Sequence, residues 1–271
     1  MKKFLLLMLT VVLALSLVAC GSADVAENDA ATESDLQYIT DKGTLTIGMT
    51  LFAPMDYYDD NNELTGFEVE FGKAVCEKLG VEADFIEINW DAKETELSSK
   101  NIDCIWNGMT ITDDRKANMS ISVPYLGNKQ VMVAKADKAE GYVTDVASAK
   151  VVAELGSAGE ELATENEFFA NAEFTGVDSM AKALMEVKSG TADIAIVDYV
   201  TSIGSIGEGT DYDDLVVVKA EDFAAEEYGI AFRKGSDVTD KVNEVIAELA
   251  ADGTLETIAK KYKLDELLLV K

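Results

Sequence analysis

The sequence predicts an α/β protein made of two lobes. Segments with the pattern of strands alternate with segments of helical periodicity, and this order gives a parallel sheet flanked by helices. The alternation stops at Ser122-Val123-Pro124-Tyr125 and then begins again. A chain of 271 residues, of which 48% are hydrophobic, is long enough to bury two cores. We therefore expect one sheet in each lobe.

The charge and the absence of histidine exclude several kinds of function. The chain has 23 lysines and arginines against 51 aspartates and glutamates, a formal net charge of −28. Nucleic acid requires a basic face, so we expect no nucleic-acid partner. The chain has no histidine, which removes the usual general base, the Ser-His and Cys-His nucleophiles and the commonest metal ligand. We expect neither hydrolytic nor zinc chemistry, no cofactor and no metal.

The first 36 residues predict a leader and a tether. Met1-Lys2-Lys3 and the apolar run 4–17 have the charged start and short hydrophobic region of a secretory signal, which we place at 1–19. Leu17-Val18-Ala19-Cys20-Gly21 resembles the lipobox of bacterial lipoproteins, which implies cleavage before Cys20 and a lipid on its sulfur. An ordinary cleaved signal with a spare cysteine is the alternative. Residues 20–36 have few bulky side chains and predict a flexible tether, so the fold should start near its end.

The first lobe opens with alternating strands and helices. Apolar residues recur every four positions from Phe67 to Leu79 and Gly80 follows, which predicts an amphipathic helix with a glycine C-cap. The acidic stretch 56–63 predicts a solvated hairpin turn, because Leu64 stands where a calcium loop needs glycine. The other elements expected here are strands at 43–48, 83–88 and 102–105 and a helix at 92–99.

The turn after the strand at 102–105 is the first candidate site. Thr112 is a plausible N-cap of a helix whose first turn carries Arg115. The backbone at Gly108, the Thr110 hydroxyl and the guanidinium then lie together at the carboxyl end of a strand, an arrangement that suits a small carboxylate. Gly108 has no side chain, so the main chain can approach a ligand closely. The alternative is a capped surface helix whose arginine pairs with an acid.

The second lobe repeats the alternation. Ser157 and Glu160 have the spacing of a capping box at a helix start. Cys76 and Cys104, in a predicted helix and a predicted strand of the first lobe, are expected to be small buried hydrophobes, with a bridge between them left open. The elements expected after residue 125 are strands at 131–134, 151–153 and 194–197 and helices that include 180–187 and 238–251, with Asp198 at the end of the third strand and the stretch 228–232 just before the last helix.

Taken in order, these motifs resemble family 3 of the extracytoplasmic solute-binding proteins of ABC importers, the polar amino acid binders. The match covers nearly all of the chain after residue 40. The motifs that carry it are Gly43-Thr44-Leu45, Ala53-Pro54, Leu64-Thr65-Gly66-Phe67-Glu68-Val69, Gly108-Met109-Thr110-Ile111-Thr112-Asp113-Asp114-Arg115, Ser122-Val123-Pro124-Tyr125, Gly156-Ser157, Ser189-Gly190-Thr191-Ala192-Asp193 with Asp198, and Ala251-Asp252-Gly253-Thr254-Leu255.

The resemblance implies a two-lobe fold of the type II periplasmic-binding-protein kind. Each lobe would hold a mixed, mostly parallel sheet flanked by helices, and two hinge segments would cross between the lobes near 125–130 and 227–232. The implied boundaries are 37–127 for the first part of lobe 1, 128–227 for lobe 2 and 228–271 for the completion of lobe 1.

The resemblance also implies a role for each site residue. Arg115 would bind the ligand α-carboxylate with Thr110 and the helix-start amides after Ser157, and Asp198 would bind the α-ammonium. Phe52 and Trp90 would sandwich the side chain. The alternatives are a helix cap, a surface acid and core aromatics. The candidate ligand-binding residues are Phe52, Trp90, Asn107, Gly108, Thr110, Arg115, Glu154, Ser157, Ala158 and Asp198.

Departures from the family pattern bear on the ligand. Met49-Thr50-Leu51 stand where binders of basic amino acids often carry an acid, and Glu68 and Tyr262-Lys263-Leu264 also differ from the usual residues. Arg115 is committed to the α-carboxylate and no other Lys or Arg is expected to face the cleft. We therefore expect a neutral polar or cationic L-amino acid, with Glu154 facing its side chain or, alternatively, solvent.

The function implied is that of a monomeric, lipid-anchored receptor at the extracytoplasmic face of the bacterial membrane. It would deliver its amino acid to the permease subunits of an ABC importer and would not be an enzyme. Two alternatives remain: a dehydratase-type enzyme on the same fold, and the ligand-sensing subunit of a signalling receptor.

Overall fold

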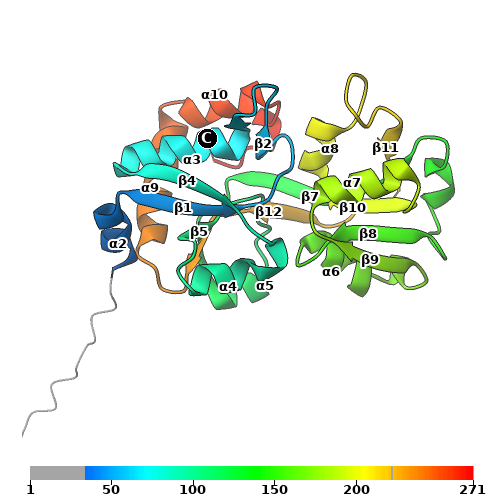
Figure 1. Cartoon of the computed structure of the whole chain (residues 1–271), viewed down its shortest axis with the longest axis horizontal. Coiled ribbons are helices and arrows are strands. Elements are labelled where there is room, and N and C mark those ends of the chain that lie inside the picture. The colour runs from blue at the N-terminus through cyan, green and yellow to red at the C-terminus, as the bar shows by residue number, and fades with distance from the viewer. Residues whose placement is uncertain (1–33, 221, 271) are drawn as a thin grey trace, which may run out of the picture. The chain divides into compact units, whose positions relative to one another are not determined.

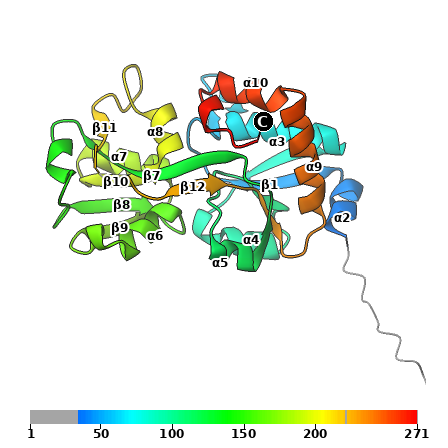
Figure 2. The same ribbon diagram turned by 180° about the vertical axis from the view of Figure 1, so that it is seen from behind.

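The computed structural model describes residues 34–220 and 222–270, so the predicted signal, the tether up to residue 33 and Cys20 lie outside the described residues. Ser34–Lys271 form one compact unit. Its two large sheets are each covered by helices (Figures 1 and 2). No helix formed by the described residues is both long and apolar enough to cross a bilayer.

The first sheet combines a parallel half with an antiparallel half. Strand β1 pairs parallel with both β4 and β5, whereas β13 pairs antiparallel with β5 and β6. A short hairpin, β2 (Tyr57–Tyr58) with β3 (Leu64–Thr65), confirms the turn predicted for the acidic stretch. In spatial order the strands are β4 (Glu82–Glu87), β1 (Thr44–Met49), β5 (Cys104–Ile105), β13 (Ala231–Arg233) and β6 (Met119–Ile121).

The second sheet has the same design. Strands β10, β8 and β9 pair in parallel, and β7 pairs antiparallel with β10, β11 and β12. Mixed sheets are confirmed, but parallel pairings make up half of the main path in each sheet rather than most of it. In order the strands are β11 (Leu215–Val217), β7 (Leu126–Lys135), β10 (Ile194–Asp198), β8 (Lys150–Glu154) and β9 (Glu173–Val177), with β12 (Ala225–Tyr228) beside β7.

The predicted helices form, most of them with buried apolar residues and some with a cap as well. Gly80 ends α3 with φ +74°, as its position predicted, and α9 has the bounds expected from its apolar face. The helices are α2 (Asp35–Lys42), α3 (Phe67–Leu79), α4 (Lys93–Ser98), α5 (Asp113–Asn118), α6 (Ala158–Glu165), α7 (Met180–Ser189), α8 (Tyr199–Ser205), α9 (Val238–Ala251) and α10 (Thr254–Lys261). Short 3₁₀ turns lie at Trp90–Ala92, Ala139–Tyr142, Glu167–Phe169 and Asp265–Leu267.

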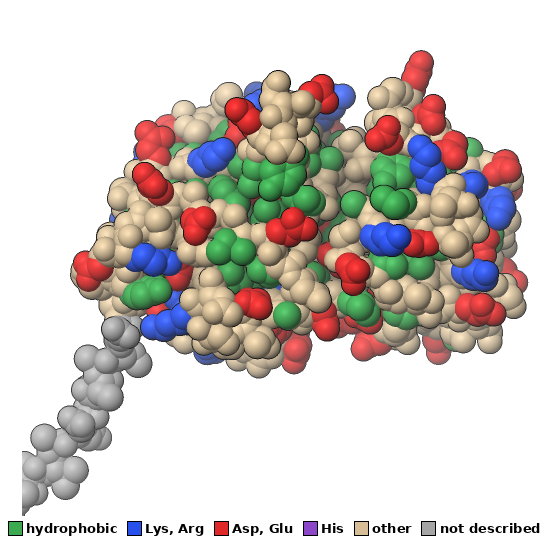
Figure 3. Space-filling model, in the orientation of Figure 1, with side chains coloured by type: hydrophobic (Ala, Val, Ile, Leu, Met, Phe, Trp, Pro, Cys, Tyr) green, Lys and Arg blue, Asp and Glu red, His purple; other side chains and the backbone are tan. Residues whose placement is uncertain are grey.

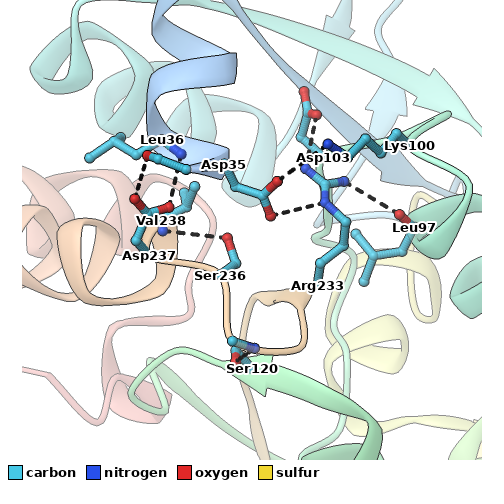
Figure 4. A network of polar contacts seen from close by, with 12 residues as sticks. Asp35, Leu36, Leu97, Lys100, Asp103, Ser120, Arg233, Ser236, Asp237 and Val238 are labelled. Carbon is cyan, nitrogen blue, oxygen red and sulfur yellow. Dashed lines mark hydrogen bonds and ion pairs between the residues drawn. The ribbon is translucent and has the colours of Figure 1, made fainter. Parts of the chain in front are cut away.

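The fold starts slightly before the predicted end of the tether. Ser34 caps α2 by accepting a hydrogen bond from the Gln37 amide, so the described chain is already helical at Asp35. Asp35 pairs with Arg233 of β13, and the Leu36 amide donates to the Asp237 carboxylate (Figure 4). These contacts fix the start of the fold against strand and helix segments from the far end of the chain.

Two long segments connect the sheets. Residues 126–129 of β7 pair antiparallel with 225–228 of β12, and both ribbons run between the two groups of helices in Figures 1 and 2. The Tyr125 amide donates to the Tyr228 carbonyl, which continues this pairing into the first lobe. They occupy the places where the two crossing segments were expected.

The two cysteines are buried free thiols, Cys76 in α3 and Cys104 in β5, which answers the question of a bridge. Burial raises the pKa of Cys76 to about 12, and that of Cys104 is raised as well. They are therefore packing residues. The face drawn in Figure 3 shows acidic side chains spread among fewer basic ones, as the net charge requires.

Candidate functional site

The predicted site residues follow the carboxyl ends of strands in both sheets. In the first lobe Phe52 comes after β1, Trp90 after β4 and residues 107–115 after β5. In the second lobe Glu154 is the last residue of β8 and Asp198 the last residue of β10. Ligands of α/β sheets bind beyond such ends, so the sequence argument and the topology select the same edge in each lobe.

Arg115 is a buried cation held by carbonyl oxygens. Thr112 caps α5 as predicted, accepting the Arg115 amide at 3.2 Å. The Arg115 side chain donates to the Thr110 carbonyl at 2.7 Å and to the Gly156 carbonyl at 3.2 Å, and the residue is 7% exposed. No ion pair between described residues includes it. The alternative of a surface arginine paired with an acid is therefore wrong for this residue.

Asp198 is the corresponding buried acid. It is 2% exposed and accepts hydrogen bonds from Asn128 at 2.8 Å and Gln130 at 2.5 Å. Burial, and then the nearby Glu226 carboxylate, raise the pKa of Asp198 to about 7. None of the ion pairs formed within 34–220 and 222–270 uses Asp198, so the alternative of an exposed surface acid is wrong.

Thr110 and Asn107 make contacts that the sequence did not predict. The Thr110 hydroxyl donates to Glu226 at 3.1 Å, across to strand β12. The Asn107 amide group donates to the Thr50 carbonyl and to Asp56, while its oxygen accepts from the Thr50 hydroxyl. These three hydrogen bonds hold the Asn107 side chain against Thr50 and Asp56, and its predicted contact with a ligand remains a prediction.

Position 108 requires glycine because of its backbone conformation and its close packing. Its φ is +54°, and a Cβ there would lie 2.9 Å from the Phe52 ring and 3.2 Å from the Tyr228 ring. Its amide donates to both carboxylate oxygens of Glu68, at 3.0 and 2.9 Å. Two rings thus fill the space that a side chain would need, and close approach of the main chain to a ligand remains a prediction.

The start of α6 faces the first lobe. The Ser157 hydroxyl accepts the Glu160 amide at 3.2 Å, and the Glu160 carboxylate reaches back to the Gly156 amide at 2.6 Å, one residue earlier than in a standard capping box. A Cβ on Gly156 would lie 2.9 Å from the Asp91 Cα, so a side chain here would collide with the first lobe. Ala158 and Thr110 line a cavity of about 620 Å³ beside this contact.

The two aromatic residues are buried in different hydrophobic clusters. Phe52 is 3% exposed and packs with the main core, whereas Trp90 is 4% exposed and packs with Leu97, Met109 and their neighbours. Both are thus core side chains in this structure, as the alternative held. The sandwich expected from the resemblance remains a prediction.

Glu154 is buried at 1% exposure, which overturns the alternative that it points to solvent. Burial, followed by the charge of Asp198, raises the pKa of Glu154 to about 8. Its Oε1 atom has no hydrogen-bond partner among the described residues.

Lys93, at the start of α4, was not among the predicted site residues. Its side-chain nitrogen donates to the Gly156 carbonyl at 2.8 Å and the Trp90 carbonyl at 3.2 Å, and lies 5.0 Å from the centre of the Trp90 ring. Burial and then Arg115 lower the pKa of Lys93 to about 8. The premise that Arg115 is the one cation facing the cleft is wrong. The sequence feature that could have revealed Lys93 is its position three residues after Trp90, the predicted site residue that follows β4.

The polar partners of Asp198 were missed as well. Asn128 and Gln130 lie two residues apart on β7, and each donates to Glu226 of β12 at 3.0 Å as well as to Asp198. Residues two apart on an extended strand lie on the same face, so the sequence could place these two side chains together. It could not show that this face of the strand lies toward Asp198.

Two α/β lobes that carry buried charges of opposite sign at their strand ends are the architecture of a small-molecule binding protein. The chain belongs to the bacterial extracellular solute-binding proteins, family 3, whose sequence pattern matches residues 45–265. Members of this family are extracytoplasmic binding proteins, and the chain is a solute-binding protein rather than an enzyme.

Three comparisons illustrate the similarity. The chain is 32% identical to the L-cystine-binding protein TcyJ of Escherichia coli K12, over 93% of this chain and 92% of that protein. It is 31% identical to the arginine-binding extracellular protein ArtP of Bacillus subtilis, over 97% and 98% of the two chains. An ABC uptake transporter substrate-binding protein from Streptococcus pneumoniae with bound histidine superimposes with a TM-score of 0.78 at 27% identity, covering 88% of this chain and 99% of that chain. These relatives bind amino acids.

Proposed function

We propose that the protein is a lipid-anchored receptor that binds a polar L-amino acid between its lobes and delivers it to the permease of an ABC importer. One observation carries the proposal: Arg115 and Asp198 are buried opposite charges on different lobes, and neither forms an ion pair between described residues. A buried charge without a counter-ion is costly. The carboxylate and ammonium of an amino acid supply both counter-ions at once.

The relatives support the ligand class. TcyJ, ArtP and the pneumococcal protein are named for cystine, arginine and histidine, all polar amino acids. The helix-start amides at Ala158 and the Arg115 guanidinium are the groups that suit the α-carboxylate. Phe52 and Trp90 stay in the proposal as residues that border the ligand side chain.

Binding requires the lobes to separate and close. We assign lobe 1 to 37–127 and 228–271 and lobe 2 to 128–227, with hinges in the crossing segments near 125–130 and 227–232. The Gly156 carbonyl of lobe 2 is contacted by Arg115 and Lys93 of lobe 1, so these bonds must break for the ligand to enter.

A thermal-shift screen of the common L-amino acids tests the ligand class, because a ligand that binds only the folded state raises Tm. We expect at least one polar amino acid to raise Tm in the wild type. Arg115→Ala should abolish that shift, whereas Lys73→Met, which changes an exposed lysine of α3, should keep it. Absence of any shift across the panel would rule out amino acid binding.

The anchor is tested separately, since it does not depend on ligand. We expect Cys20→Ser to move the protein from the membrane fraction to the soluble fraction while amino acid binding is retained, because one lipid on Cys20 is the proposed attachment. A Cys20→Ser protein that stays in the membrane fraction would contradict the lipoprotein assignment and leave the binding site untouched.

A further inference from the structure

The site holds two buried cations and two buried acids, more charge than one amino acid head group needs. Both cations, Arg115 and Lys93, come from lobe 1, on α5 and α4. Both acids, Asp198 and Glu154, come from lobe 2, at the ends of β10 and β8. All four residues are at most 7% exposed, and no ion pair between described residues joins a cation of this set to an acid.

We propose that Lys93 and Glu154 form a second head-group subsite, so that the preferred ligand carries two zwitterionic amino acid heads joined by a short linker. This inference rests on the function proposed above, in which Arg115 and Asp198 hold the first head. Lys93 would take the second carboxylate and Glu154 the second ammonium.

The hydrogen bonds leave capacity for such a head. A lysine ammonium has three N–H donors, and two of those of Lys93 go to the carbonyls of Trp90 and Gly156. The Glu154 Oε1 atom is buried and lacks a partner among the residues that the structure describes. One donor and one acceptor are thus available, on opposite lobes, which is what a carboxylate and an ammonium require.

The two subsites are close enough for one small molecule. Lys93 Nζ and an Arg115 side-chain nitrogen both contact the Gly156 carbonyl oxygen, at 2.8 and 3.2 Å, so these two nitrogens are at most about 6 Å apart. The acids end adjacent parallel strands, which run about 4.8 Å apart. A ligand that spans a few atoms between its heads can therefore reach both pairs.

The charges balance with a two-headed ligand. One head pairs with Arg115 and Asp198 and leaves Lys93 and Glu154, which act on each other electrostatically but form no direct ion pair among the described residues, buried without a directly bonded counter-ion. This costs free energy if both stay ionised. A second head supplies a carboxylate and an ammonium to that pair. An acidic side chain would satisfy Lys93 alone, and a cationic one would satisfy Glu154 alone.

Calorimetry on the full chain in non-reducing buffer tests the proposal with three probes. L-cystine and L-cystathionine carry two heads, whereas S-methyl-L-cysteine keeps the sulfur and one head. We expect the wild type to bind the two-headed probes about thirtyfold or more tighter than S-methyl-L-cysteine, the loss typical of a buried charge left unpaired. Equal affinity for one-headed and two-headed probes would overturn the proposal.

Variants separate the second subsite from the first. Lys93→Met and Glu154→Gln should weaken the two-headed probes much more than S-methyl-L-cysteine, Lys93→Arg should restore part of the preference, and Lys73→Met should change nothing. Equal weakening of all probes by Lys93→Met, in a variant with wild-type thermal unfolding, would mean that Lys93 supports only the lobe contact. If the wild type binds no amino acid of either kind, the proposed function itself fails.

Discussion

Two arginines of this protein, the partly buried Arg233 and the buried Arg115, have opposite surroundings. Arg233 pairs with Asp35 at 2.9 Å and Asp103 at 3.5 Å and also donates to the Leu97 and Ile102 carbonyls (Figure 4). Arg115 has two carbonyl partners and, within the described residues, no acidic one. One cation is paired directly with acids inside the fold, and the other is held by carbonyls, with acids nearby but no direct ion pair among the described residues.

The acids show the same difference. Asp103 accepts from the Thr46 amide and pairs with Lys42 and Arg233. Asp198 has neutral amide partners and a pKa raised by burial to about 7. Groups satisfied by the protein serve the fold, whereas buried charges that the protein leaves uncompensated indicate where an opposite charge from outside binds.

The largest expected effect is on binding by the uncompensated arginine. Arg115→Ala should cost about 2–5 kcal/mol of amino acid affinity, the loss found when one partner of a desolvated pair is removed. The free energy of unfolding without ligand should stay the same or rise, because a buried unpaired charge has gone. Calorimetry and urea unfolding measure the two quantities. Unchanged affinity would show that Arg115, like Arg233, serves the fold and not ligand binding.

The converse effect is expected for the compensated arginine. Arg233→Met should lower the free energy of unfolding by about 2–3 kcal/mol, because Asp103 stays buried after losing a charged donor. Ligand affinity should remain within error. The control is Lys241→Met, which removes a surface pair with Glu244 and should change stability by less than about 0.5 kcal/mol. A large loss of affinity in Arg233→Met with intact stability would remove the distinction.

The uncompensated acid predicts a pH dependence of binding. Asp198 must be ionised to hold an ammonium, and its pKa of about 7 leaves it largely protonated below that pH in the free protein. A bound ammonium lowers this pKa, so binding releases a proton and affinity should rise by up to about tenfold per pH unit towards pH 7, then level off. Asp198 also interacts electrostatically with Glu154, Glu226, Tyr228 and Arg115, and these groups influence its titration as well.

Calorimetry with a one-headed neutral amino acid between pH 5 and 8 measures this dependence. Asp198→Asn should bind weakly at every pH and show a flatter profile. A wild-type affinity that is constant over this range would exclude Asp198 as the titrating ammonium partner.

The smallest effect is expected at the start of the fold. Ser34→Ala should cost about 0.5–1 kcal/mol of stability, because the Gln37 amide loses its cap and Asp237 loses a donor. Thr40→Ala in the same helix is a matched control, since its hydroxyl bonds only carbonyls of its own turn. Equal losses in the two variants would show that Ser34 contributes no capping.

Local sequence patterns accounted for most of the fold. Residues close together in the sequence were enough to predict three features: the helix α3 with its Gly80 C-cap, the Thr112 cap of α5, and the full length of α9. The pattern was weaker where strands pair antiparallel. The stretch 228–232 carried no strand prediction, yet the chain leaves β12 at Tyr228 and enters β13 at Ala231, in the other sheet.

The sequence by itself determined the two-lobe α/β class, the family and the residues at the strand ends, because these depend on periodicity and motif order. Only the tertiary structure decided which charges are compensated. Arg233 meets Asp35 across 198 positions, and Lys93 meets Gly156 across 63. A residue type carries no record of such distant partners, so Lys93 escaped detection, the rings around Gly108 were not foreseen, and Glu154 was left open between cleft and solvent. Burial and pairing belong to the folded chain as a whole.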